Sequence, residues 1–268
     1  MVVEVDGRFR GVEGEIVYRR WTPDGPPGRI VAIVHGYAEH GGRYAHVARA
    51  LTARGGVVYA GDHMGHGRSE GARALITDFD HAVADLHTLL LMARDEYPRL
   101  PMVLVGHSMG GLLSGRMAQA RPEEVTAVGF CGAVIGDWAW ARRAITLPEI
   151  PDAGFDPLAL SRDPAVGASY AADPLVYHGR YKRALLVAEV AALESFAANI
   201  DRLTMPVALF HGSADPLVPF GRSCRAIEDM PSADKEVHIY PGARHEVLNE
   251  INRDQIIGDL ATWIGRVA

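Results

Sequence analysis

Short apolar runs alternate with longer amphipathic stretches along most of the chain. The apolar runs have the length of buried strands, and they fall at residues 30–34, 57–60, 102–105, 125–131, 207–210 and 236–240. Stretches of helical spacing separate them, which is typical of a mostly parallel, doubly wound α/β sheet. Ahead of these runs, residues 12–21 predict antiparallel strands at the edge of the sheet.

Three stretches carry the clearest helical pattern. From Asp78 to Tyr97, apolar side chains recur on one stripe, with Asp78 as the candidate N-cap and Pro98 as the stop signal. A second helical run covers residues 184–196. The third closes the chain, with Ile256, Ile257, Leu260, Trp263, Ile264 and Val267 on its apolar side.

The alternation of strand and helix stops between residues 135 and 203. No run there has the pattern of a buried strand, and the segment contains Trp138 and Trp140. Because α/β sheets bind ligands at the carboxyl ends of their strands, we expect a helical cap inserted after the sixth strand and covering that edge. The predicted domains are a core of residues 1–134 and 204–268 and a cap, or lid, of residues 135–203. A plain extra layer of helices is the alternative.

Composition narrows the class of protein. With 268 residues, 48% of them hydrophobic, the chain can bury one large core. A net charge of −6 provides no basic surface, so we expect no nucleic-acid partner. The two cysteines, Cys131 and Cys224, predict neither a disulfide framework nor a metal site. No apolar run reaches the roughly 18 residues of a spanning helix, and the first residues do not resemble a secretory signal, so we expect a soluble, cytoplasmic protein.

A nucleophilic serine is predicted at the end of the run at 102–105. Residues 106–110 read Gly106-His107-Ser108-Met109-Gly110, and helical spacing follows them. A serine that projects from a tight strand-to-helix turn needs small residues on either side, which explains the glycines. The strand, turn and helix context makes Ser108 the candidate nucleophile.

A serine hydroxyl needs a base, and the base needs a third group to hold it. In sheets of this kind the chain order is serine, acid, histidine. Asp215 follows the strand at 207–210, and His245 lies on the loop between the last strand and the last helix. His245 is the histidine that has a loop position in the right order. Asp137, after the strand ending at Cys131, is the alternative acid.

Catalysis also requires donors for the negative charge that develops on the substrate oxygen. The backbone N–H of Met109, next to the nucleophile, is the first candidate. The second is the N–H of Tyr37, since the loop after the strand at 30–34 begins with the pair His35-Gly36. The alternative for this pair is an ordinary glycine turn.

Four blocks together carry a family resemblance. They are residues 35–44 (HGYAEHGGRY), 62–69 (DHMGHGRS), 106–111 (GHSMGG) and 240–246 (YPGARHE). The chain resembles the monoacylglycerol lipase and lysophospholipase branch of the α/β-hydrolase superfamily over nearly its whole length, and segments 161–164 and 170–176 look like the cap of that family. The resemblance implies the α/β-hydrolase fold, a triad of Ser108, Asp215 and His245, and an oxyanion hole from the Tyr37 and Met109 amides.

The resemblance also implies residues that contact the substrate. Glu39 and Arg43 fall where the family has polar groups near the glycerol end of the substrate, and His107 is a further candidate that also fits a bracing role. The alternative for Glu39 and Arg43 is a surface salt bridge with i,i+4 spacing at a helix start. Ala38 stands where the family often has glycine, and Tyr37 is bulky for its position.

We therefore expect a serine esterase that cleaves monoacylglycerols or similar carboxylic esters through an acyl-enzyme, with neither metal nor cofactor. A lysophospholipid, a thioester and a peptide amide stay open as alternative substrates, because fold and triad do not separate them. A protein of the same fold that binds a ligand without catalysis is the alternative to an enzyme. Transient contact of the cap with a membrane, a cap that binds another protein, and the oligomeric state are also open.

Overall fold

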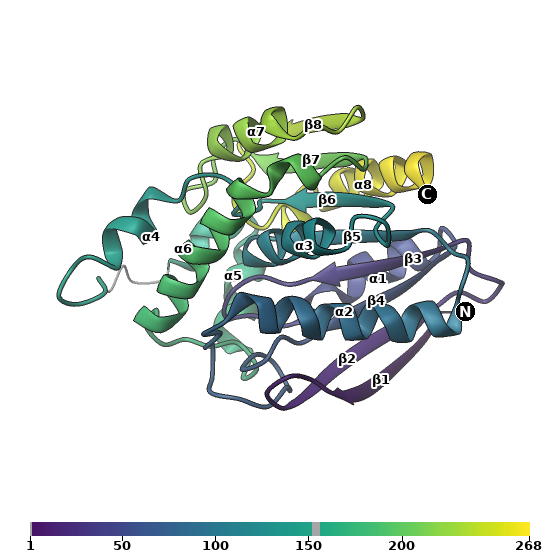
Figure 1. The fold of residues 1–268 in the computed structure, drawn as a ribbon, viewed down its shortest axis with the longest axis horizontal. Helices are drawn as coiled ribbons and strands as arrows, with labels where there is room; N and C mark the ends of the chain where they lie inside the picture. Colours follow the sequence, from purple (N-terminus) through teal and green to yellow (C-terminus); the bar gives the residue numbers. More distant parts are fainter. Residues whose placement is uncertain (1, 152–155) are drawn as a thin grey trace.

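A single sheet forms the centre of the structure, a computed structural model that describes residues 2–151 and 156–268 (Figure 1). Its strands run in the order β1-β2-β4-β3-β5-β6-β7-β8. They are β1 (Val3–Arg10), β2 (Glu15–Thr22), β3 (Arg29–Val34), β4 (Gly56–Gly61), β5 (Met102–His107), β6 (Ala127–Cys131), β7 (Val207–Gly212) and β8 (Lys235–Tyr240). Strand β2 pairs antiparallel with β1 and β4, and the other pairs are parallel. The predicted mostly parallel sheet is confirmed.

The edge of the sheet differs from the prediction. Residues 12–21 were expected to hold the antiparallel strands, but the hairpin is made by β1 and β2, and its turn lies at residues 11–14, where the Gly11 amide donates to the Gly14 carbonyl. Strand β1 escapes the hydrophobic pattern because most of its side chains are exposed. The expected strand at 125–131 also begins two residues later, at Ala127.

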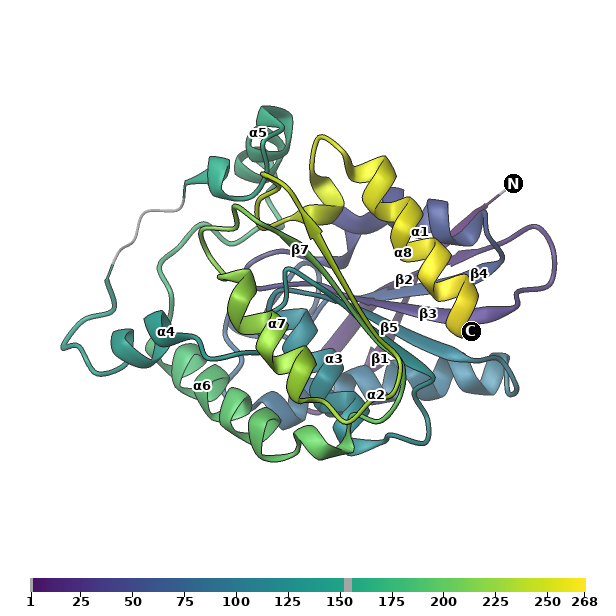
Figure 2. The same ribbon diagram turned by 90° about the horizontal axis from the view of Figure 1, so that it is seen from above.

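Helices cover both faces of the sheet (Figure 2). Helices α1 (Ala45–Thr52) and α8 (Arg253–Val267) pack on one face, and their apolar cluster includes Val47, Leu260 and Trp263. Helices α2 (Phe79–Glu96), α3 (Met109–Ala120) and α7 (Phe220–Asp229) contribute to the cluster on the other face. Asp78 is confirmed as the N-cap residue of α2, since its carboxylate accepts a hydrogen bond from the Asp80 amide. None of the described helices is long and apolar enough to cross a membrane.

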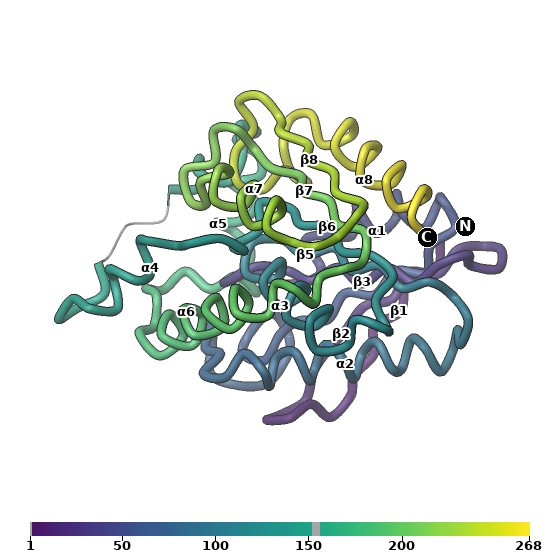
Figure 3. Tube along the Cα trace, turned by 45° about the horizontal axis from the view of Figure 1, so that its top comes forward, coloured from purple at the N-terminus to yellow at the C-terminus, as the bar shows by residue number. Residues whose placement is uncertain are grey.

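The segment between β6 and β7 contains helices and no strand in its described residues. Its elements are α4 (Ala139–Ala144), η2 (Pro157–Ala159), α5 (Pro164–Ala172), α6 (Arg183–Ala198) and η3 (Ile200–Arg202). Helices α4, α5 and α6 gather at one end of the sheet (Figures 1 and 3). Residues 152–155 of the predicted cap lie outside the described residues. The division into core and cap remains a prediction, to which this placement gives support.

Candidate active site

Ser108 stands on the sharp turn between β5 and α3. Its backbone has φ 52° and ψ −122°, outside the regions that non-glycine residues favour. The turn needs small neighbours: a Cβ at Gly106 would lie 2.4 Å from the Gly110 carbonyl oxygen, and one at Gly110 would lie 2.1 Å from that of Val34. The Ser108 amide donates to the Cys131 carbonyl at 3.1 Å, which ties the turn to β6. The glycines of the predicted motif therefore have a steric cause.

The structure brings the three predicted triad residues together. The distance from Ser108 Oγ to His245 Nε2 is 2.9 Å, and that from His245 Nδ1 to Asp215 Oδ2 is 2.8 Å. Asp215 follows β7 and His245 follows β8, so both come from the carboxyl ends of strands next to one another in the sheet. The alternative acid, Asp137, lies half-exposed and pairs with Arg142 at 3.2 Å. The geometry therefore favours Asp215.

Both oxygens of Asp215 are held by further donors. The amides of Leu217 and Val218 donate to Oδ1 at 2.9 Å each. Oδ2 contacts His211 Nε2 at 3.0 Å as well as His245 Nδ1. Sequence reasoning missed His211, although its place at the end of β7, four residues before Asp215, was the available signal. With four donors around it, the carboxylate has one orientation.

Burial and the contact between Asp215 and His245 shift the pKa values of both residues. Burial by itself raises the pKa of Asp215, but the charge of His245 and the hydrogen bonds from both histidines outweigh burial and hold that pKa below its ordinary value. Burial lowers the pKa of His245, whereas the charge and hydrogen bond of Asp215 raise it, to a net value above the ordinary 6.5. The contact with Asp215 thus favours the protonated form of His245.

The backbone amides predicted to bind the oxyanion belong to Tyr37 and Met109, and both residues adjoin the turn at Ser108 or its neighbour Gly36. Met109 is the first residue of α3, and Tyr37 follows Gly36, where an added Cβ would lie only 3.1 Å from Ser108 Cβ. In the described part of the chain neither the Tyr37 nor the Met109 amide has an acceptor. The loop is held by the Gly36 amide, which donates to Glu39 Oε1 at 2.7 Å. The predicted oxyanion hole of these two amides stays a prediction, to which the missing acceptors give support.

The loop that carries Tyr37 is also tied to the predicted cap. Ala38 has φ 66°, so the backbone keeps the left-handed conformation that glycine favours even though alanine occupies the position. Its carbonyl accepts from the Tyr177 amide at 2.8 Å. His40 Nε2 contacts Asp173 Oδ2 at 2.9 Å. These contacts were not predicted, because no sequence pattern pairs residues so far apart.

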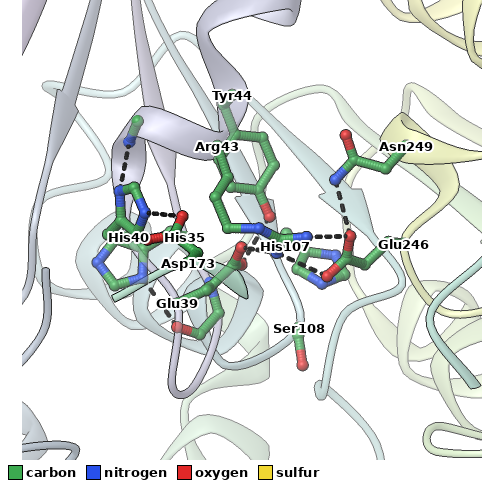
Figure 4. A network of polar contacts seen from close by, with 12 residues as sticks. His35, Glu39, His40, Arg43, Tyr44, His107, Ser108, Asp173, Glu246 and Asn249 are labelled. Atoms are coloured by element: carbon green, nitrogen blue, oxygen red, sulfur yellow. Dashed lines mark hydrogen bonds and ion pairs between the residues drawn. The ribbon is translucent and has the colours of Figure 1, made fainter. Parts of the chain in front are cut away.

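Arg43 lies in a buried ion-pair network (Figure 4). Its guanidinium donates to Glu39 at 2.5 Å and to both carboxylate oxygens of Glu246 at 2.7 Å. The Tyr44 hydroxyl also donates to Glu39, and the Asn249 amide donates to Glu246. The side chains of Arg43, Glu39 and Glu246 are 10%, 2% and 3% exposed, so a surface salt bridge was the wrong alternative for the pair. The network joins the Tyr37 loop to the residue that follows His245.

His107 lies against the ring of His245, with 4.7 Å between the ring centroids. Its Nδ1 is 3.0 Å from the Cys131 carbonyl oxygen, which makes this nitrogen the donor. Burial first, and the nearby charge of His245 second, lower the pKa of His107 to about 4. His107 is therefore neutral at pH 7 and serves as a wall behind the candidate base.

A cavity of about 940 Å³ opens over Ser108 and His245. Its walls come from both the sheet loops and the predicted cap, including Glu39, His107, Tyr170, Tyr177, Tyr181 and Leu158. Within the described residues, no group of three or more His, Cys, Asp or Glu side chains has the arrangement of a metal site. The cavity has the size of a pocket for one small organic ligand.

Comparisons with known proteins agree with this geometry. The family model described as "Serine aminopeptidase, S33" matches residues 25–252. A monoacylglycerol lipase of Mycolicibacterium smegmatis is 38% identical, over 96% of this chain and 95% of its own, and a monoglyceride lipase of Rattus norvegicus is 31% identical, over 98% and 89%. The crystal structure of a Paleococcus ferrophilus monoacylglycerol lipase covers all of both chains with a TM-score of 0.80 and 26% identity.

The eight-stranded sheet, the strand-to-helix turn at Ser108 and the order of serine, aspartate and histidine define an α/β-hydrolase. Within that superfamily the chain belongs to the family of the serine aminopeptidase S33 model, in the branch that contains the monoacylglycerol lipases. The resemblance stated from the four sequence blocks is confirmed.

Proposed function

We propose that this protein hydrolyses the ester bond of monoacylglycerols and releases a fatty acid and glycerol. The observation that carries the proposal is the series of hydrogen bonds from Ser108 through His245 to Asp215. Ser108 and His245 line a cavity of about 940 Å³. The named monoacylglycerol and monoglyceride lipases among its relatives, which match nearly the full chain, support the choice of substrate.

In the proposed mechanism His245 takes the proton of Ser108 as Oγ attacks the ester carbonyl. The Tyr37 and Met109 amides donate to the oxyanion of the tetrahedral intermediate, and each such donor is worth about 2.7–4 kcal/mol. His245 then protonates the departing glycerol alkoxide, which leaves an acyl group on Ser108. Water attacks that acyl-enzyme with His245 again as the base, and the fatty acid departs.

The polar wall beside Ser108 is the proposed position of the glycerol group. Glu39 and His107 line the cavity there, and we assign them to substrate contact. The guanidinium carbon of Arg43 lies 4.8 Å from the centroid of the Tyr170 ring, which covers it. The guanidinium donates its hydrogen bonds to the carboxylates of Glu39 and Glu246. Its proposed role is to hold Glu39 and Glu246 in place.

The proposed domain division makes residues 135–203 a lid over the core of residues 1–134 and 204–268. Leu158 and Leu217 line the cavity and are 52% and 38% exposed, so apolar surface borders the opening. We propose that this border makes transient contact with a membrane or micelle from which the substrate is taken. A cytoplasmic location belongs to the same proposal.

Replacement of Ser108 tests the proposal directly. The Ser108→Ala variant should lose turnover of monoacylglycerols and covalent labelling by a fluorophosphonate probe, because the hydroxyl in contact with His245 Nε2 is then missing. The same assay on lysophospholipids, thioesters and aminoacyl amides separates the alternative acyl substrates. Hydrolysis that persists in Ser108→Ala would contradict the assignment, and a wild-type protein inert to all these esters would indicate a binding protein on this fold.

A further inference from the structure

One block of the sequence, residues 62–69, has no role in the proposed mechanism. It follows β4 and lies at the carboxyl end of the sheet, against His35. The His63 amide donates to His35 Nε2 at 2.9 Å, and His63 Nε2 lies 3.0 Å from the His35 carbonyl oxygen. The two imidazole rings also pack together, with 4.0 Å between their centroids. The loop of residues 62–69 therefore holds the ring of His35 in place.

Both ring nitrogens of His35 have a backbone partner, and the two partners fix its tautomer. A carbonyl oxygen only accepts, so Nδ1, which lies 2.8 Å from the Gly36 carbonyl oxygen, carries the proton. A backbone N–H only donates, so Nε2 presents its lone pair to the His63 amide. The side chain is fully buried, and burial holds the pKa of His35 well below the ordinary 6.5. His35 is therefore a neutral imidazole with one defined donor at pH 7.

The acceptor of this donor belongs to the same peptide unit as the Tyr37 amide. The Gly36 carbonyl and the Tyr37 N–H share one planar trans peptide, in which the two groups point in opposite directions. The hydrogen bond from His35 to the carbonyl thus fixes the direction of the Tyr37 N–H, away from the His35 ring. The same bond polarises the peptide, because hydrogen bonds in series strengthen one another.

This peptide borders the cavity next to the candidate nucleophile. Gly36 and Tyr37 line the cavity together with Ser108, whereas His35 lies behind them in the protein interior. A Cβ on Gly36 would lie 3.1 Å from Ser108 Cβ, so the loop and the serine are in close contact. The preceding N–H, that of Gly36, is already bonded to Glu39 Oε1 at 2.7 Å. His35 and Glu39 thus hold the polar groups of the loop on its buried side, and the Tyr37 N–H is left for a ligand.

We propose that His35 is a positioning residue of the reaction: its Nδ1–H, kept in one tautomer by residues 62–69, orients the Gly36–Tyr37 peptide so that the Tyr37 N–H meets the oxyanion. This inference rests on the proposed ester hydrolysis. His35 contacts neither the substrate nor the reacting atoms, and it acts through the peptide. Without its hydrogen bond the peptide can turn, which weakens binding of the transition state more than binding of the substrate.

Substitutions that keep or remove one ring nitrogen test the inference. His35→Asn keeps an N–H donor near the position of Nδ1. His35→Gln places its amide near the position of Nε2, and His35→Leu removes both polar groups. With a monoacylglycerol we expect kcat to fall by about 10²-fold in the Gln and Leu variants, the lower end of the loss for one oxyanion donor. KM should change by less than about two-fold, and His35→Asn should recover about ten-fold in kcat.

A trifluoromethyl ketone with the same alkyl chain separates oxyanion binding from general damage to the fold. Ser108 Oγ adds to its carbonyl carbon, His245 takes the serine proton, and the carbonyl oxygen becomes an oxyanion that is bound without turnover. The inhibition constant Ki should rise across the His35 variants by the same factor by which kcat falls. A purely structural role of His35 would lower the melting temperature without this parallel.

His66→Leu is the matched control. His66 is a buried histidine of the same cluster, with 5.5 Å between its ring centroid and that of His35, and its Nδ1 bonds to the Met64 carbonyl instead of the Gly36 carbonyl. It should keep kcat and Ki within about two-fold of wild type, even where its melting temperature falls.

Wild-type kcat and Ki in a folded His35→Gln variant would overturn the positioning role and leave the proposed function standing. Equal losses in His35→Asn, His35→Gln and His66→Leu would also overturn it, because they would indicate general damage to the cluster. A wild-type protein that neither hydrolyses the ester nor binds the ketone would overturn both proposals. Melting temperatures identify any variant that does not fold. If His35→Leu is one of these, the comparison of His35→Asn with His35→Gln decides.

Discussion

The protonation of His245 depends on the polar groups on either side of its ring. Its Nδ1 faces a carboxylate that four donors hold in place, and its Nε2 faces the serine hydroxyl. The negative charge of Asp215 favours the protonated imidazole, whereas the proposed role of His245 as a base requires the neutral imidazole. The pH dependence of the reaction therefore reports the contact between His245 and Asp215.

We expect kcat/KM to fall on the acid side with an apparent pKa above 6.5, because the carboxylate raises the pKa of His245. His107, with a pKa of about 4, stays neutral through that range. In Asp215→Asn the raising charge is gone, so the acid limb should move to lower pH while kcat falls by about 10⁴-fold. Rate profiles against pH for both proteins measure this, and an acid limb that does not move in the variant would contradict the assigned contact.

Among the elements, the turns and loops at the carboxyl ends of the strands assemble the site. Ser108, the Tyr37 loop, Asp215 and His245 all follow parallel strands. These strands are β3 and β5, which are neighbours, and β7 and β8, which are also neighbours, with β6 between the two pairs. The loops are held in part by apolar contacts, since Tyr44, Ala243 and Val247 lie in a buried cluster. Arg43 links the Tyr37 loop to the His245 loop, because its guanidinium donates to both Glu39 and Glu246.

Removal of Arg43 should therefore cost far more than removal of a surface arginine. Arg43→Met leaves two buried carboxylates without their cation, and we expect the free energy of unfolding to fall by about 3–5 kcal/mol. Arg49→Met is the control, because Arg49 is 58% exposed and pairs with Glu4 at the surface, where a pair is worth about 0–1 kcal/mol. Urea denaturation of the two variants measures the difference. Equal losses would show that the network does not stabilise the loops.

The elements differ in how far the sequence predicts them. The strands at 30–34, 57–60, 102–105 and 207–210 were placed within two residues, because strands buried on both faces read as continuous apolar runs. Strand β1 was missed because it lies at the exposed edge, and there the backbone pairing to β2 determines the structure. The contact of Ser108, Asp215 and His245 was predictable from the order of motifs, although their catalytic roles stay a prediction. The partners of Arg43 were not, since no periodicity relates Arg43 to Glu246.

At the scale of the whole molecule, the cavity lies between the predicted core and the predicted cap. Its volume of about 940 Å³ is near the upper end of the roughly 300–1,000 Å³ found for small-molecule pockets. We expect a space of this size to accept one long acyl chain with its glycerol group and to exclude three such chains.

Hydrolysis should accordingly be fastest on monoacylglycerols. We expect kcat/KM to be at least about ten-fold lower for matched diacylglycerols and lower again for triacylglycerols, a ratio equal to about 1.4 kcal/mol of transition-state binding. Rates on mono-, di- and triacylglycerols of one acid, presented in the same micelles, measure this. Equal rates on all three would mean that the cap opens far wider than the cavity described above.

Arg43 and Glu246 are 203 residues apart in the chain, and Ser108 and His245 are 137 apart. Contacts of such long range form late, since the intervening chain must first be ordered. During synthesis the nascent protein already contains Ser108 and its sheet strands while His245 and Glu246 are still untranslated. The order of residues along the chain thus keeps the proposed active site incomplete until the segment that carries His245 and Glu246 has folded, and recovery of activity after denaturation should report that step.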